Sequence, residues 1–439
     1  MTDASIIGKI KITGELILKS PLLIGDGAGE TADNFEDIHV LRNSEGVPFI
    51  PGTSLCGVLR EYVESIDKKS VEELFGDAKK FQSAIQIDDI KLDKTEIITR
   101  DGVRIDGLTG TGIDGGKYDY EAVDRGAVGN LNMLVNLRGC HGEILKDTIT
   151  VLIGRLKNGI RLGALTSKGF GLAEVKDLKA QFYDFTKKAD VIAWLTDKDS
   201  QSKTISSAKK ISDSPADFIV DAKFAFNSSF IVRDYDISID DESKTISAVS
   251  MRSRNDFVIP GTSLKGIFRH RAEYIFRKLG LDEKKLDNLM GTSDNKTKIK
   301  SRFIVAESYV KNENVADIEH TRNKIDRFTG GVLQGTLFTT KPVWQKKFDA
   351  PAITIHFEIH NAKDYEAALG ICLLRDLWLG NVAIGGEKSI GRGTVKGISA
   401  DIHFKGKNYK LDKNGKVTVG NSDELSKISA SIKEWGDNK

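Results

Sequence analysis

Cysteine and proline are both scarce in this chain of 439 residues, which contains three cysteines and seven prolines. Cys56, Cys140 and Cys372 are too few and too far apart for a disulfide framework or a cysteine-rich zinc site. The sequence also lacks an uninterrupted apolar run of about 18 residues, and its polar start shows no signal peptide. We therefore expect a cytoplasmic protein that does not contact a membrane.

An excess of one charge is also missing, because 65 Lys and Arg residues face 63 Asp and Glu residues, a net charge of +2. This balance neither requires nor excludes nucleic acid, since a local basic face fits inside a neutral total. Three catalytic patterns are absent: the Gly-x-x-x-x-Gly-Lys-Ser/Thr loop, His-Glu-x-x-His and Gly-x-Ser-x-Gly. The aromatic signature of RNA-recognition motifs is missing too. Glycine, in contrast, is abundant at 42 residues and occurs in short clusters.

An internal repeat is the strongest signal that is present. The segment Pro51–Arg60 returns as Pro260–Arg269, with most positions identical and an offset of 209 residues. Each copy continues through a strand pattern, a helix, a long excursion, a second helix and a glycine-rich loop. This order is typical of a ferredoxin-like fold. We predict an α+β protein with two tandem ferredoxin-like (RRM-like) modules, each carrying a protruding hairpin and a glycine-rich loop.

The repeat also predicts the boundaries. The first module spans residues 8–178 and the second spans 216–400, joined by a polar connection at 179–215. Residues 401–439 lie outside the repeat and are expected to form a hairpin around Asn414-Gly415 and a helix. The pattern does not decide whether this segment caps a sheet edge or docks a neighbour.

The repeated Pro-Gly-Thr-Ser turn opens a helix, whose N-terminus offers unpaired N–H groups to an anion. Ser54 and Ser263 either cap these helices or contact phosphate. Arg60 and Arg269 lie further along, and Lys265 adds charge in the second copy. The alternative is an ordinary helix start with solvated arginines, but two such starts need not share the flanking residues.

The glycine-rich loops at 163–171 and 385–393 close the two copies. Glycine lets a backbone approach a phosphate chain, and Lys168, Lys388 and Arg392 place positive charge there. A tight strand connection is the alternative.

The long excursions share the pattern Thr-Arg…Ile-Asp-x-x-Thr-Gly. Arg100, Arg104 and Arg322 stand at their bases. A flexible finger with basic residues at its root can lie across a nucleic acid strand and separate bases, whereas a plain surface loop is the alternative.

The acidic loops at 25–38 and 233–246 hold the carboxylates that could support chemistry. A carboxylate beside an RNA phosphate can hold a divalent cation or orient the attacking hydroxyl. Carboxylate-rich stretches are also common on solvated surfaces.

Together these motifs resemble the RAMP superfamily of CRISPR systems. Each copy is similar to the backbone subunit of type III effector complexes, and the tandem form resembles the fused subunits of type III-D systems. The resemblance implies binding to guide RNA (crRNA), to target RNA and to other effector subunits. It also implies a thumb that displaces bases, and Mg²⁺-dependent cleavage of the target by a loop aspartate. Guide pairing would supply sequence specificity.

Carried over onto this sequence, the catalytic aspartate falls on Asp37, with Asp33 as the nearest competitor. The ungapped equivalent in the second copy is Ile246, so Asp240 or Asp241 would have to serve there. Asp37 and Asp241 are the predicted metal ligands. Two alternatives stay open: a scaffold that binds crRNA without cutting, and a crRNA-processing endonuclease that needs no metal.

Overall fold

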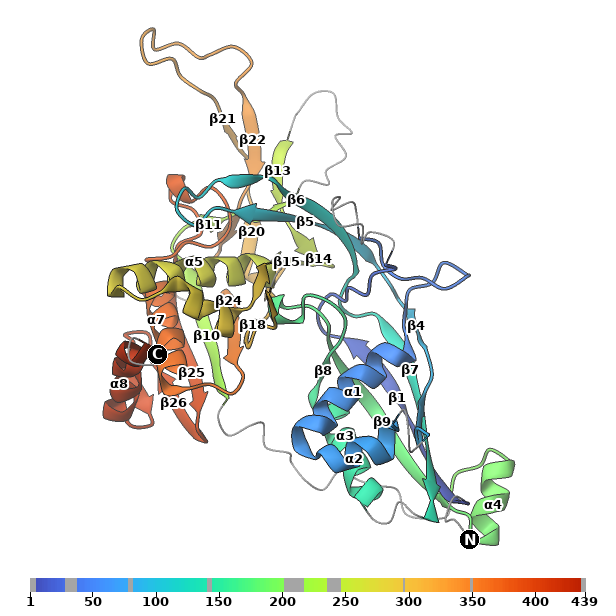
Figure 1. Ribbon diagram of the computed structural model, residues 1–439. Coiled ribbons are helices and arrows are strands. Elements are labelled where there is room, and N and C mark those ends of the chain that lie inside the picture. The colour runs from blue at the N-terminus through green and yellow to red at the C-terminus, as the bar shows by residue number, and fades with distance from the viewer. Residues whose placement is uncertain are drawn as a thin grey trace. The chain divides into compact units, whose positions relative to one another are not determined.

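The computed structural model describes residues 5–27, 38–77, 82–139, 144–200, 217–234, 246–294, 297–347 and 350–435. These residues fall into two compact units. The first consists of Met1–Asp106, Gly112–Thr166 and Phe170–Ser212, and the second holds the rest of the chain. Figure 1 shows the elements of both units in chain order.

The sheet of the first unit is built around β1 (Ile6–Leu18), which lies between two antiparallel neighbours. It pairs with β7 (Val128–Arg138) on one side and with β9 (Leu172–Asp184) on the other. The strand order is β2-β4-β7-β1-β9-β8, and β3 also pairs with β7. The remaining strands are β2 (Phe49–Ile50), β3 (Ile85–Ile87), β4 (Ile90–Asp93) and β8 (Ile160–Arg161).

Three helices cover one face of this sheet: α1 (Gly52–Ile66), α2 (Lys68–Phe75) and α3 (Ile144–Asn158) (Figure 1). Their burial follows the helical spacing read from the sequence. The apolar stripe of α3 is almost completely buried, and it consists of Ile149, Leu152, Ile153 and Leu156. Alternate residues of β1, including Ile10 and Ile12, meet these helices and complete the core.

A long hairpin extends from the first unit between β4 and β7. It consists of β5 (Ile97–Ile105) and β6 (Gly112–Val123), paired antiparallel with a register shift near Val103. The glycines of this excursion belong to paired strand and turn, and Gly110 and Gly115 have positive φ. We call this hairpin the first thumb.

The second unit repeats the plan around β10 (Phe218–Phe226). This strand lies between β24 (Ile353–Ile359) and β25 (Val395–Phe404), both antiparallel to it. The order β18-β24-β10-β25 corresponds to the order β3-β7-β1-β9 of the first unit. One face is covered by α5 (Gly261–Leu279) and α7 (Asp364–Trp378) (Figure 1).

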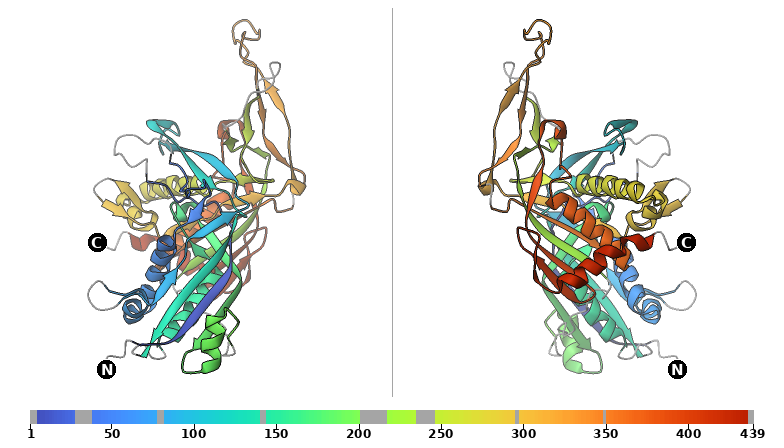
Figure 2. Two further views of the ribbon diagram at one scale, coloured as in Figure 1. Left: turned by 90° about the vertical axis from the view of Figure 1, so that its right-hand side faces the viewer. Right: turned by 90° about the vertical axis from the view of Figure 1, so that its left-hand side faces the viewer.

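The second thumb is the projection formed by β21 (His320–Arg322), β22 (Phe338–Lys341) and the residues between them (Figures 1 and 2). Phe328 belongs to the segment that connects the two strands, and it is completely exposed. The short strands around the root and the sheet edge are β11 (Ser229–Phe230), β12 (Arg233–Asp234), β13 (Ile246–Ser250), β14 (Arg252–Ser253), β15 (Asp256–Ile259), β16 (Thr292–Asp294), β17 (Thr297–Ile299), β18 (Phe303–Val305), β19 (Ser308–Val310), β20 (Val315–Asp317) and β23 (Val343–Gln345).

The C-terminal segment extends the second sheet and covers α7. β26 (Lys407–Leu411) pairs with β25, β27 (Val417–Val419) pairs with β26, and α8 (Ser422–Ala430) follows. Trp435 donates its indole N–H to the carbonyl of Tyr365 at 2.9 Å. This segment therefore caps the sheet edge of its own unit.

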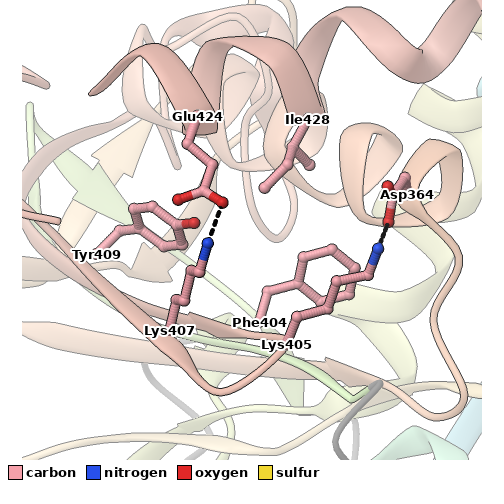
Figure 3. A pocket seen from close by; sticks show the side chains of 7 residues that line it. All are labelled: Asp364, Phe404, Lys405, Lys407, Tyr409, Glu424 and Ile428. Atoms are coloured by element: carbon pink, nitrogen blue, oxygen red, sulfur yellow. Dashed lines mark hydrogen bonds and ion pairs between the residues drawn. The ribbon is translucent and has the colours of Figure 1, made fainter. Parts of the chain in front are cut away.

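A small pocket of about 110 Å³ lies where this segment meets the sheet (Figure 3). Lys405 Nζ lies 2.5 Å from Asp364 Oδ1, and Lys407 forms an ion pair with Glu424. Both lysines point to carboxylates, so the Lys407–Glu424 pair holds α8 against the sheet and the Lys405–Asp364 pair holds the start of α7. Its lining residues are Asp364, Phe404, Lys405, Lys407, Tyr409, Glu424 and Ile428.

The predicted fold class is confirmed: both units have an antiparallel sheet in the ferredoxin-like order with helices on one face. One detail differs, because β9 continues to Asp184, beyond residue 178. The strand continues because Gln181 and Tyr183 keep pairing with Lys11 and Lys9 of β1 after a register shift. A short helix, α4 (Lys188–Leu195), follows.

The face of the second sheet opposite its helices carries a row of charged side chains. His356 Nδ1 lies 2.8 Å from Asp221 Oδ1, and its Nε2 lies 3.8 Å from Glu358. Asp221 is also paired in register with Asp401, which contacts Lys410 at 3.1 Å. Burial by itself lowers the pKa of His356, but hydrogen bonds to the two carboxylates outweigh burial and raise its pKa to about 9.

His356→Gln should destabilise the protein in a pH-dependent way. Because the folded pKa lies above the ordinary value near 6.5, the stabilisation is complete below about pH 6.5 and is lost as the pH rises through about 9. Thermal unfolding of wild type and variant should therefore differ most at acidic pH and converge in alkali. Lys223→Gln, on the same sheet face, controls for loss of a charge. A Tm difference that stays constant across this range would contradict the assignment.

Candidate nucleic-acid interface

In the first unit, the Pro-Gly-Thr-Ser turn and the glycine-rich loop line one groove of about 430 Å³. Ser54 and Gly57 of α1 form one wall, and Gly163 and Ala164 form another, although the two segments are over a hundred residues apart. A Cβ at Gly57 would meet no atom within 4 Å, so this wall is open. The remaining lining residues are Leu23, Ile24, Gly25, Thr53, Val58 and Glu61.

The N-terminus of α1 is not left empty for an anion. Pro51 is the N-cap and makes no side-chain cap, while the N–H of Gly52 donates to Asp89 Oδ1 at 2.7 Å. Pro260 begins α5 in the same way, without a side-chain cap. Neither serine therefore stands at the N-cap position, and a phosphate at α1 would share the helix N-terminus with the Asp89 carboxylate.

The basic residues predicted to bind RNA in the first module (residues 8–178) occupy different environments. Arg60 is exposed and lies seven residues after Thr53, on the same side of α1 as the groove wall. Lys168, in the glycine-rich loop, is half-buried, and burial lowers its pKa. Arg100 is buried at the root of the first thumb, whereas Arg104 is exposed on the hairpin.

The first acidic loop leaves and rejoins the described chain at the root of the first thumb. Before the loop, the N–H of Asp26 donates to the carbonyl of His39 at 3.2 Å. After it, Ile38 forms a bridge with Tyr120 of β6, and the N–H of Glu121 donates to the carbonyl of Ile38 at 2.8 Å. The loop that contains Asp33 and Asp37 is thus anchored at both ends beside this thumb.

Glu121 fastens the returning chain. Its Oε2 accepts from the N–H of Val40 at 3.1 Å and from Arg42 at 3.0 Å, and it lies 3.6 Å from His39 Nδ1. The segment His39–Arg42 takes part in isolated bridges and in no named strand. His39 is therefore part of an anchoring contact at the edge of the acidic loop.

Two aspartates face each other across the first thumb. Asp101 and Asp119 are partners in the β5–β6 register, and Lys117 Nζ lies 3.6 Å from Asp101. Burial and the neighbouring Asp119 raise the pKa of Asp101. Tyr120 is buried against Phe170 with ring centroids 5.9 Å apart. The side chain of Tyr120 therefore packs inside the hairpin root.

The acidic loop of the second unit also begins and ends beside the root of a thumb. Arg233 and Asp234 of β12 pair with Ser250 and Val249 of β13. β13 in turn runs parallel to β22 of the second thumb, with Ile246 paired to Thr339. Both acidic loops therefore begin and end at the root of the thumb in their own unit.

The second glycine-rich loop carries charged side chains that converge. Glu387 Oε2 lies 3.0 Å from Arg322 Nη2 and 3.0 Å from Arg392 Nη1, and Oε1 lies 3.3 Å from Arg233 Nη2. Arg392 is buried, whereas Lys388 of the same loop is exposed. Two of the predicted RNA-binding residues, Arg322 and Arg392, are thus brought together by a glutamate.

The helix residues of the second unit make internal contacts. Lys265 is buried, its Nζ lies 2.8 Å from Ser301 Oγ, and burial lowers its pKa to about 7. Arg269 donates to Asp287 Oδ1 and to the carbonyl of Gly291, both at 2.6 Å. Ser263 is half-buried. These contacts hold the helix in the free chain, and contact of the three residues with RNA stays a prediction.

The predicted catalytic residues Asp33, Asp37, Asp240 and Asp241 lie outside the described residues. Cys140 lies outside them as well. Within the described ranges, no group of three or more His, Cys, Asp or Glu side chains is arranged to hold a metal ion. The described helices include none that is long and apolar enough to cross a membrane.

Sequence reasoning missed three acidic residues that organise this region. Asp89 occupies the start of α1, Glu121 fastens the chain after the acidic loop, and Glu387 gathers arginines. Glu387 had a visible signal, because it stands between two glycines and a lysine in the repeated loop. Asp89 and Glu121 had none, since their partners are distant in sequence.

The structure places this chain in a class of proteins built from two tandem ferredoxin-like modules. Each module has a thumb whose root lies beside the ends of an acidic loop. The model of the RAMP superfamily matches residues 15–174 and 227–396, and the chain belongs to this superfamily. The predicted tandem organisation is thereby confirmed.

A solved structure with a similar chain is the cryo-EM structure of the Type III-B Cmr-beta bound to cognate target RNA. The match has a TM-score of 0.31 and 15% sequence identity, and it covers 39% of this chain and 61% of that chain. The matched part thus spans less than two thirds of that chain. No curated protein matches the sequence.

Gly393→Ala should displace the second glycine-rich loop. A Cβ at Gly393 would lie 1.9 Å from the carbonyl oxygen of Ile384, and φ is +78°. Gly406→Ala is the matched control, because its φ is +73° but nothing lies within 4 Å of the new Cβ. The left-handed conformation alone costs a residue with a Cβ roughly 1–2 kcal/mol, so the free energy of unfolding should fall clearly further for Gly393→Ala. Equal losses in denaturant titrations would show that the close approach is not required.

Proposed function

We propose that the protein is a backbone subunit of an RNA-guided type III CRISPR effector complex and binds crRNA along both modules. The observation that carries the proposal is the gathering of distant motifs. In the first unit, the helix turn and the glycine-rich loop line one groove, while both ends of the acidic loop lie at the thumb root. Family membership supports the same conclusion.

Contact with RNA is proposed through phosphate groups and not through bases. The groove of the first unit has an open glycine wall, the described residues that line it include no aromatic residue, and the exposed Arg60 follows on the same helix. Such a surface accepts a sugar–phosphate chain of any sequence. Target RNA would then be recognised by pairing with the guide, and other effector subunits would be partners along the same RNA.

Cleavage of the paired target RNA is the second part of the proposal. Asp37 is the first catalytic residue we propose, with Asp33 beside it, and Asp240 or Asp241 would serve in the second module. The support is the anchoring of both acidic loops at a thumb root. A bound Mg²⁺ ion would supply charge stabilisation at the scissile phosphate. Asp37 and Asp241 are the ligands we propose for it.

Arg60→Gln should weaken binding of single-stranded RNA irrespective of sequence. Each phosphate contact on a single strand contributes a slope of about −0.7 to the dependence of log Kobs on log salt. The variant should therefore show a slope shallower by about 0.7 in fluorescence anisotropy titrations with the full chain. Lys157→Gln, an exposed basic residue on α3, is the control. Unchanged affinity and slope for Arg60→Gln would remove it from the interface.

Replacing Asp37, Asp240 and Asp241 together by alanine should abolish cleavage of complementary target RNA by the assembled effector with Mg²⁺. Binding of crRNA should persist, because these loops are not proposed to hold the guide. Gel analysis of labelled target, with separate single-module variants, assigns each cut. If every cut remains, the chain is a scaffold and another subunit cleaves. Cutting of repeat RNA in EDTA by the isolated wild-type chain would instead identify a crRNA-processing enzyme.

A further inference from the structure

The corner where the second glycine-rich loop meets the second thumb holds three arginines around one glutamate. Arg322 Nη2 donates to both carboxylate oxygens of Glu387, at 3.1 and 3.0 Å. Arg233 and Arg392 approach the same carboxylate at 3.3 and 3.0 Å. The four residues come from β12, β21 and the loop, so the cluster joins three separate segments of the second unit.

Among the described residues that form this cluster, positive charge is in excess. Even if only Arg322 and Arg392 are counted, two guanidinium charges face one carboxylate. Arg392 is only 7% exposed, and burying an arginine is costly unless an anion compensates it. Among the described residues, Arg322 Nε is a buried atom without a hydrogen-bond partner, whereas Arg392 Nη1 lies 3.0 Å from Glu387 Oε2. The cluster therefore has positive charge that Glu387 alone does not balance.

The first unit shows that the loop does not need these charges to adopt its shape. Leu165 stands where Glu387 stands in the repeated loop, and the two residues have φ of 56° and 55°. Phe170 stands at the position of Arg392 and is completely buried. It packs with Tyr120 and Ala122 in an apolar cluster. The same loop is thus held by apolar packing in one unit and by ion pairs in the other.

Exposure separates the arginines into two groups. Arg322 and Arg233 keep 29% and 42% of their side chains exposed, so they are able to reach a ligand at the surface. Arg392 lies behind them and adds charge from the interior. Glu387, at 9% exposure, is covered by the guanidinium groups. A carboxylate in this place fixes the planes of the guanidinium groups around it.

We infer that this corner binds a backbone phosphate of a nucleic acid strand and that Glu387 is the positioning residue that orients its arginines. The inference rests on the proposed function. It adds a role for Glu387 and a difference between the two modules. The guanidinium fork matches a phosphodiester in geometry and charge. The first unit, with Leu165 and Phe170 in these positions, lacks such a site, so the two modules hold RNA differently at their glycine-rich loops.

The experiment transplants the apolar pair of the first unit into the second. Glu387→Leu with Arg392→Phe in the full chain should unfold at a temperature close to wild type, because the first unit already uses these residues in the same loop. Affinity for a single-stranded oligouridylate should fall about tenfold, and the slope of log Kobs against log salt should become shallower by about 0.7 per lost contact. Glu424→Gln, which removes a carboxylate from a distant ion pair in the same unit, is the control.

The single variant Glu387→Gln separates positioning from simple charge neutralisation and does not depend on the transplant folding. Positioning predicts weaker RNA binding, and no further loss when Glu387→Gln is combined with Arg322→Gln. Tighter or unchanged binding by Glu387→Gln would overturn the inference. If the wild-type protein binds RNA but Glu387→Gln gives this result, only the inference about the corner fails and the proposed function stands. If the wild-type protein does not bind RNA, the inference and the proposed function both fail.

Discussion

The antiparallel pairing of one central strand on both sides is the constraint on which the rest of the structure depends. β1 is held between β7 and β9, and β10 is held between β24 and β25. Because β9 and β25 enter the sheet directly after the glycine-rich loops, the pairing places each loop against the end of the central strand. A Cβ at Gly163 would lie 2.3 Å from the carbonyl oxygen of Leu23, and a Cβ at Gly385 would lie 2.4 Å from that of Ile231. Both positions therefore exclude a side chain. The same strand end leads into the acidic loop, which is why loop, turn and thumb root meet.

Repeated motifs were therefore the part of the site that the sequence could predict. The Pro-Gly-Thr-Ser turn, the glycine-rich loops and the thumb pattern recur in a fixed order, and periodicity located the helices α1 and α3 that support them. What periodicity could not supply was the partner of each charged side chain. Arg269 and Arg60 look alike in the repeat, yet Arg269 bonds Asp287 and Gly291 while Arg60 is exposed. The repeat places Glu72 and Gly76 at the positions of Asp287 and Gly291, so only the tertiary structure distinguishes the two arginines.

Charge in this protein is arranged locally and not as a global excess. A net charge of +2 gives no field that would attract RNA from a distance, but the arginine cluster of the second unit concentrates positive charge beside glycine backbone. The acidic residues are distributed just as selectively: Asp89, Glu121 and Glu387 each hold a backbone or arginine group in place. The near-neutral total thus reflects carboxylates that organise the basic surface from within.

Duplication allowed the two units to solve one structural problem in two ways. In both units, two side chains hold the glycine-rich loop against the thumb root. The first belongs to a residue with positive φ, and the second lies five positions later in the sequence. The first unit uses Leu165 and Phe170, whose burial is insensitive to salt, and the second uses Glu387 and Arg392, whose attraction is screened by salt. The first solution commits the loop to its shape before any ligand arrives. The second leaves charge that a phosphate can share, so the loop of the second unit is coupled to its ligand in a way that the first is not.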